Sequence, residues 1–159
     1  MDAQLTINIK ADDQPSIHQI RHGFEIGSYQ LLISELTRAE VVKAPSICLT
    51  PSTPDWFAGF MNHRGEMVPV YDLNRYLEIL DGKTAPQSWV LLIDDHPKTV
   101  GVLLTQPPQS ITDPVLLDQA CGDLPDVIRQ AAGQVYEHQD RHWVEIDHHR
   151  LFLALKKQF

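Results

Sequence analysis

The sequence predicts an all-β protein with short helices. Its apolar residues lie in short runs, such as residues 29–33 and 100–104, that are bounded by Gly, Pro, Asn or Asp. Runs of this kind between turn-forming residues are typical of strands joined by tight turns. The segments with helical spacing are short, and each follows a capping Asp or a Pro.

Residues 1–22 are polar and weakly patterned, so they are predicted to form a mobile N-terminal arm, although residues 5–9 alternate well enough for an added edge strand. Residues 23–159 are expected to form a single domain. The chain is 43% hydrophobic, and this length can bury an ordinary core without disulfides or metals.

The first half predicts two hairpins and a capped helix. Residues 24–26 and 29–33 flank a Gly-Ser pair, which is a two-residue hairpin signal, and a turn that begins with Pro is predicted over 53–59. A second turn at 62–65 separates Phe60-Met61 from the strand-like run 67–71. Asp72 is a good N-cap, and apolar residues at helical spacing follow it as far as Gly82.

The second half is predicted to begin after a polar connector, residues 81–88, where the two halves of the domain would be joined. Pro125 would open a helix that Gly133 stops. The other expected elements are a hairpin of 89–93 with 100–104, a hairpin of 134–137 with 143–146, and a final apolar segment at 151–155.

The two halves use the same order of elements. From Pro54 a turn, a hairpin and a strand lead to Asp72, and from Pro125 a helix, a hairpin and a strand lead to Asp147. This order predicts a structural pseudo-repeat, with chance similarity as the alternative.

The run from Gly59 to Leu73 resembles the signature of CheW-like coupling domains of bacterial chemotaxis and related signalling arrays. In that signature a turn with the pattern G…N-L-R-G leads into a strand that contains Pro, and the strand ends at the pair D-L. This chain has His63 at the position in the turn where Leu is usual. Upstream, GFEIGSYQLLI and the TPDW turn are also similar to the family, and closest to its type IV pilus branch. The resemblance implies two small interlocked β-barrels with a hydrophobic seam between them. The matching residues are Gly59, Asn62, Arg64, Gly65, Val68, Pro69, Val70, Asp72 and Leu73.

The resemblance also implies an adaptor that works without chemistry. Such domains couple a methyl-accepting chemoreceptor to a CheA-type histidine kinase, in chemotaxis or in twitching motility. Counting back from Arg64 places Glu40 on the family's acidic position, so the two are expected to pair at the receptor-facing edge, near Arg38. An ordinary exposed pair, worth ~0–1 kcal/mol, is the alternative.

Val41 and Ile47 are the candidate kinase-facing residues. If Val42 points inward along its strand, Val41 points out, and Ile47 could continue the exposed apolar patch. Packing in the core is the alternative for each.

Two departures from the family limit the receptor assignment. The strand at 100–104 is not followed by the aspartate that is common there, and Arg38 stands where a small apolar residue is frequent. A regulator that binds the same kinase surface without a receptor is therefore the alternative function.

The charge and hydropathy of the chain bear on its partners and its location. A net charge of −8 and a pI near 5.3 argue against nucleic-acid binding and against an anionic membrane surface. No leader-like segment and no apolar run of about 20 residues is present, which predicts a cytoplasmic protein without membrane insertion. Cys48 and Cys121 are expected to be reduced, buried thiols, with a disulfide between them as the alternative.

No catalytic motif was found, so we expect no enzyme activity, no cofactor and no metal. A histidine-metal enzyme is the remaining alternative, because His138 and His142 stand at i, i+4 and His148-His149 follow Asp147. In a hairpin, however, that spacing places side chains across a turn, and no HExxH or Cys/His framework appears.

Overall fold

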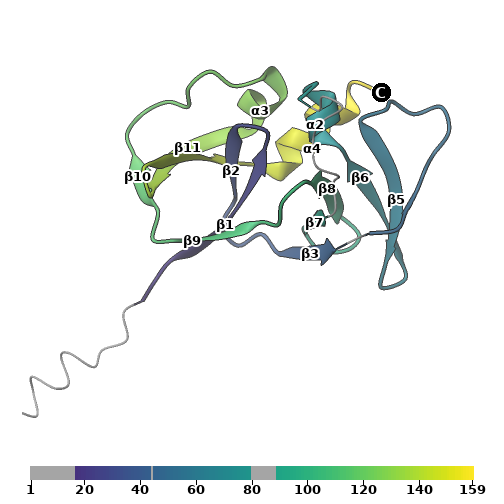
Figure 1. Cartoon of the computed structure of the whole chain (residues 1–159), viewed down its shortest axis with the longest axis horizontal. Coiled ribbons are helices and arrows are strands. Elements are labelled where there is room, and N and C mark those ends of the chain that lie inside the picture. The colour runs from purple at the N-terminus through teal and green to yellow at the C-terminus, as the bar shows by residue number, and fades with distance from the viewer. Residues whose placement is uncertain (1–16, 44, 80–88) are drawn as a thin grey trace, which may run out of the picture.

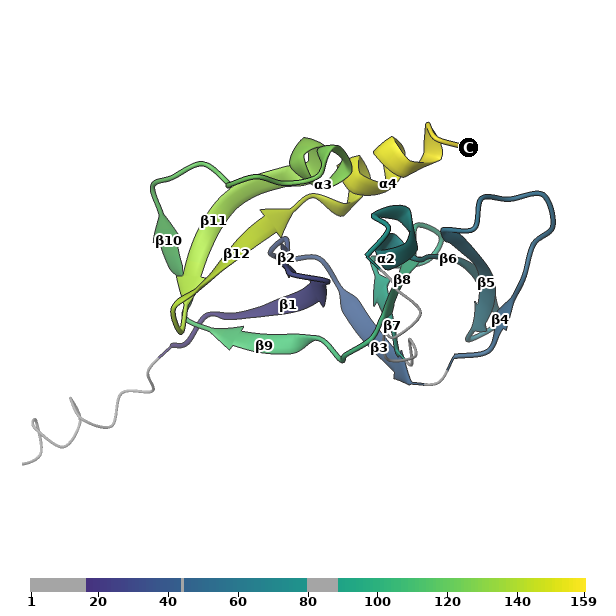
Figure 2. The same ribbon diagram turned by 45° about the horizontal axis from the view of Figure 1, so that its top comes forward.

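The computed structural model describes residues 17–43, 45–79 and 89–159, and its strands form two six-stranded sheets. The sheets curl into two lobes that lie side by side, and the helices gather where the lobes meet (Figures 1 and 2). This arrangement confirms the predicted all-β fold with short helices. The helices are α2 (Leu73–Tyr76), α3 (Asp126–Ala131) and α4 (His148–Lys156).

The first sheet has the strand order β10-β11-β12-β2-β1-β9, and the second has the order β3-β7-β8-β6-β5-β4. The strands of the first sheet are β1 (Ile20–Ile26), β2 (Tyr29–Ile33), β9 (Gln109–Thr112), β10 (Val115–Leu117), β11 (Ala132–His138) and β12 (Arg141–Ile146). Those of the second are β3 (Ala39–Lys43), β4 (Ile47–Cys48), β5 (Phe57–His63), β6 (Glu66–Tyr71), β7 (Trp89–Ile93) and β8 (Val100–Leu104).

The chain interlocks the two sheets. It starts in the first sheet, builds all of the second from β3 to β8, and then returns to complete the first. The predicted junction at 81–88 lies outside the described residues, but β6 before it and β7 after it belong to the same sheet. The crossings between sheets lie instead at 34–38 and 105–108, so the predicted place of the junction was wrong.

The predicted hydrophobic seam is present between the sheets. Leu31 and Ile33 of β2 share one core cluster with Leu91 and Ile93 of β7, while Leu32, between the first pair, faces a separate cluster inside the first lobe. Both faces of these strands are therefore buried, which explains why their sequences are continuous apolar runs without alternation.

The four predicted hairpins form, with β1 pairing β2, β5 pairing β6, β7 pairing β8, and β11 pairing β12. The helix after Pro125 also forms, but Gly133 does not stop it. Ala132 is already extended, and Gly133 lies within β11, in a register shift between Ala132 and Val135. The helix after Asp72 is shorter than expected; its predicted end at Gly82 lies outside the described residues.

The pseudo-repeat is visible in matching contacts. The Asp72 N–H donates to the carbonyl of Trp56 at 2.7 Å, and the Asp147 N–H donates to the carbonyl of Ala131 at 2.9 Å. Each aspartate then caps the helix that follows it. The preceding strands also match, because β6 runs parallel to β8 as β12 runs parallel to β2.

The N-terminal boundary differs from the prediction. Residues 20–22 belong to β1 and pair with β9, so the arm cannot extend to residue 22, and the possible strand at 5–9 lies outside the described residues. Cys48 and Cys121 are both free, but Cys48 is exposed on β4, contrary to the expected burial. Among the described residues, no helix has the length and apolar character that crossing a membrane requires.

Candidate protein-interaction site

Glu40 connects two distant parts of the second sheet. It lies on β3, at one end of the strand order, and its carboxylate contacts the β5–β6 turn near the other end. Arg64 Nη2 donates to Glu40 Oε1 at 2.9 Å, and His63 Nε2 lies 3.1 Å from Glu40 Oε2. The predicted pairing of Glu40 with Arg64 is therefore present. His63, for which sequence reasoning found no role, is the second partner of the same carboxylate.

The β5–β6 turn has the geometry that presents these side chains. His63 pairs with Glu66, which leaves a two-residue turn, and both of its residues have positive φ, 53° at Arg64 and 85° at Gly65. Two positive φ values are the mark of the tight hairpin turn that matches strand twist. The Asn62 side chain accepts a hydrogen bond from the Gly65 N–H at 3.0 Å and so holds the turn.

An open groove of about 610 Å³ runs beside this cluster. Across it the β7–β8 turn contributes two more ion pairs, His96 to Glu66 at 3.1 Å and Arg38 to Asp95 at 3.6 Å. Arg38 lines this groove, and its acidic partner is Asp95. The groove carries both signs of charge, and the charged groups come from three separate segments of the chain.

The two candidate kinase-facing residues have different surroundings. Val41 is 41% exposed, and Val42 packs inward against the core cluster of the second lobe, so their faces are as predicted. Ile47 is only partly exposed and packs on the same cluster as Val42. Met67 also lines a shallow hollow beside Ile47 and is 58% exposed. The sequence analysis did not identify Met67 as a candidate.

The other signature residues shape the fold. A Cβ on Gly59, where φ is +132°, would lie 2.1 Å from the carbonyl oxygen of Cys48, so glycine lets β4 approach β5. Asp72 accepts the Arg75 N–H at 3.0 Å, and Leu73 is buried in the seam. Pro69 lies on β6 opposite Phe60.

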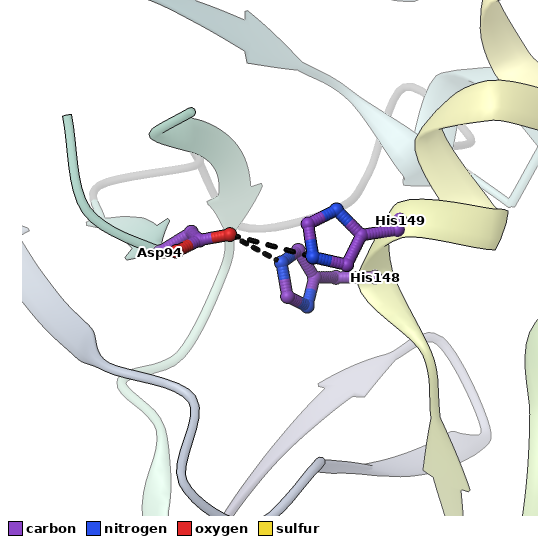
Figure 3. A group of neighbouring side chains, drawn as sticks. All are labelled: Asp94, His148 and His149. Atoms are coloured by element: carbon purple, nitrogen blue, oxygen red, sulfur yellow. Dashed lines mark hydrogen bonds and ion pairs between the residues drawn. The ribbon is translucent and has the colours of Figure 1, made fainter. Parts of the chain in front are cut away.

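The histidines at i, i+4 do not converge. On the β11–β12 hairpin, His142 pairs with Glu137, whereas His138 pairs with Arg141. A different group comes together at the seam, where His148 and His149 of α4 face Asp94 of the β7–β8 turn (Figure 3). The hydrogen bond from His148 is the main cause that lowers the pKa of Asp94 below its usual value, and the Asp95 N–H lowers it further.

Three comparisons bear on the identity of the chain. The family model described as the CheW-like domain matches residues 22–154. Protein FrzA of Myxococcus xanthus is 32% identical over 65 residues, which are 41% of this chain and 41% of FrzA, so the chain spans about two fifths of the length of this relative. The crystal structure of the scaffolding protein TtCheW from Thermoanaerobacter tengcongensis superposes with a TM-score of 0.66 at 20% identity, over 86% of this chain and 93% of that one. At that identity the likeness concerns the fold.

Proposed function

The chain belongs to the CheW-like family, and from this membership we propose that it is a non-catalytic cytoplasmic adaptor that couples a methyl-accepting chemoreceptor to a CheA-type histidine kinase. The array it serves would control chemotaxis or, if the chain belongs to the type IV pilus branch, twitching motility. The observation that carries the proposal is the exposed contact of Glu40 with Arg64, because the family signature and the acidic position upstream of it meet there.

The receptor contact is assigned to the groove beside Glu40. The side chain of Arg64 is 76% exposed and that of Arg38 is 81% exposed, so a partner can reach both guanidinium groups. A surface with both signs of charge selects a partner with the complementary charges and fixes the position at which that partner binds. The internal ion pairs are exposed and individually weak, so exchanging them for contacts with a partner costs little.

The kinase contact is assigned to the neighbourhood of Val41 and Ile47. Val41 supplies exposed apolar surface, and the hollow beside Ile47 adds Met67. An apolar centre with a polar rim is the usual anatomy of a protein interface. Contacts of modest strength, repeated through an array, would give a stable assembly by effective concentration.

The test is a binding assay with the receptor's cytoplasmic fragment and the kinase from the same bacterium. We expect both to bind, and we expect Arg64→Glu to weaken receptor binding by about tenfold or more without unfolding the chain. The double change Glu40→Arg with Arg64→Glu should restore part of the loss.

Arg129→Glu is the matched control, because Arg129 is an exposed arginine on α3 that also pairs with a carboxylate. Receptor binding that survives Arg64→Glu unchanged would contradict the assignment of this edge. A wild-type chain that binds the kinase and no receptor would instead identify the receptor-independent regulator.

A further inference from the structure

We propose that Asp94, His148 and His149 form a binding site for one divalent transition-metal ion of the zinc class, at the seam between the two sheets. The proposal does not depend on the adaptor function. It replaces the expectation of no metal, which rested on the absence of a ligand motif. No motif could reveal this group, because Asp94 precedes His148 by 54 residues in the chain.

The ligand atoms converge on one point. His148 Nε2 lies 3.0 Å and His149 Nε2 lies 3.6 Å from the same oxygen, Asp94 Oδ2, and all three ligand atoms lie within 4.8 Å of one another. Ligand atoms around a tetrahedral zinc ion with bonds of about 2.0–2.1 Å are about 3.3 Å apart. Small shifts of the side chains would therefore let the three groups bind one ion.

Neighbouring contacts already orient these ligands. Asp94 Oδ1 accepts the Asp95 N–H at 2.8 Å, which leaves Oδ2 to face the histidines, and Thr99 Oγ1 donates to the Asp94 carbonyl at 3.1 Å. Asp147 caps α4 by accepting the His149 N–H at 2.9 Å, so both histidines stand on a fixed first turn. Partners of this kind around a metal ligand raise affinity, because they remove the cost of orienting it.

The donor set indicates the class of ion. Two imidazole nitrogens and one carboxylate oxygen suit zinc and its neighbours better than magnesium or calcium, which prefer oxygen ligands. His148 is buried, whereas the side chain of His149 is 63% exposed, so the ion would lie at the surface with a position open to water.

A metal ion here would join the two lobes. Asp94 directly follows β7 of the second sheet, and His148 opens the helix that continues from β12 of the first. An ion bound to both would hold α4 against the β7–β8 turn. Since Asp94 also lines the groove beside Glu40, occupancy would fix one wall of that groove.

The experiment uses the full chain, freed of purification tags and stripped with chelator, and titrates it with Zn²⁺ alone. We expect one ion per chain with a dissociation constant of about 10 µM or below. The melting temperature should rise by about 5–10 °C at an ion concentration of ~100 times the dissociation constant, and chelator should reverse the rise.

Two variants and a control locate the ion. His149→Ala removes an exposed ligand, and Asp94→Asn keeps the shape at a position with φ +77°, which asparagine tolerates. Each should weaken binding by about tenfold or more, whereas His142→Ala, on the β11–β12 hairpin, should not change it. If His149→Ala proves misfolded by circular dichroism, Asp94→Asn alone decides. The absence of stoichiometric binding, or variants that bind as the wild type does, would overturn the proposal, because the group would then be an ion pair only.

Discussion

Two signature glycines, Gly59 and Gly65, are predicted to differ sharply in their importance for stability. Both have positive φ, +132° at Gly59 and +85° at Gly65, so a side chain is strained at either position. Their surroundings differ. A Cβ at Gly59 would lie 2.1 Å from the backbone oxygen of Cys48, whereas a Cβ at Gly65 would meet no atom within 4 Å.

The magnitudes follow from these contacts. Gly65→Ala should cost about 1–2 kcal/mol of unfolding free energy, which is the cost of a positive φ for alanine. Gly59→Ala carries the same cost and also forces β4 away from β5, because a backbone oxygen cannot rotate aside. Losing that pairing and the packing of Ile47 brings the expected total to about 3–5 kcal/mol.

Urea unfolding of the two variants and the wild type measures these costs. For a chain of this size, each kcal/mol corresponds to a shift of about 2–4 °C in melting temperature, which gives an independent check. An equal loss in both variants, or a larger loss for Gly65→Ala, would refute the argument from the Cys48 contact.

The remaining predictions concern the apolar surface and the acid response. Val41→Asp should weaken kinase binding and change the unfolding free energy by no more than about 0.5 kcal/mol. Ile47→Asp should weaken kinase binding and also lower the unfolding free energy by about 2 kcal/mol. A kinase pulldown and urea unfolding measure the two effects separately, and an Ile47→Asp variant as stable as the wild type would place Ile47 outside the core. The hydrogen bond from His18, followed by that from the Gln19 N–H, lowers the pKa of Asp113 below its usual 3.8. The stability that the ionised Asp113 side chain contributes to the fold is therefore present above pH 3.8 and is lost as the pH falls through the lowered pKa. Asp113→Asn should be less stable than the wild type at pH 7, with a difference that shrinks in acid. A difference that is constant with pH would contradict this.

The sequence was sufficient to predict the hairpins, because their turns and apolar runs are local signals. The pairs β1–β2 and β5–β6 each contain their own turn, and Asp72 and Asp147 each cap a helix from within three residues. The short strands β4, β9 and β10 were not individually predicted. Their two to four residues carry no periodicity of their own, and only pairing with distant strands makes them extended.

The candidate site was predictable only in part. Glu40 and Arg64 could be paired because the family signature relates their positions along the chain. The contacts of Glu40 with His63 and of Arg38 with Asp95 depend on how the second sheet curls. No local sequence pattern predicts that curvature. For the same reason the group of Asp94, His148 and His149 became visible only once α4 was placed against the β7–β8 turn.

The interlocked chain order has a consequence for how the protein is made. All strands of the second sheet lie within residues 39–104, so that sheet can assemble while the ribosome is still adding the rest of the chain. The first sheet cannot, because β2 pairs with β12 and the hydrogen bond from Ser34 to Ile146 spans 112 residues. Closing so long a loop is slow, and until it closes β2 lacks its parallel neighbour β12. The nascent hairpin of β1 and β2 therefore stays without this neighbour until β12 has left the ribosome, and during this interval the unpaired edge of β2 is prone to aggregation.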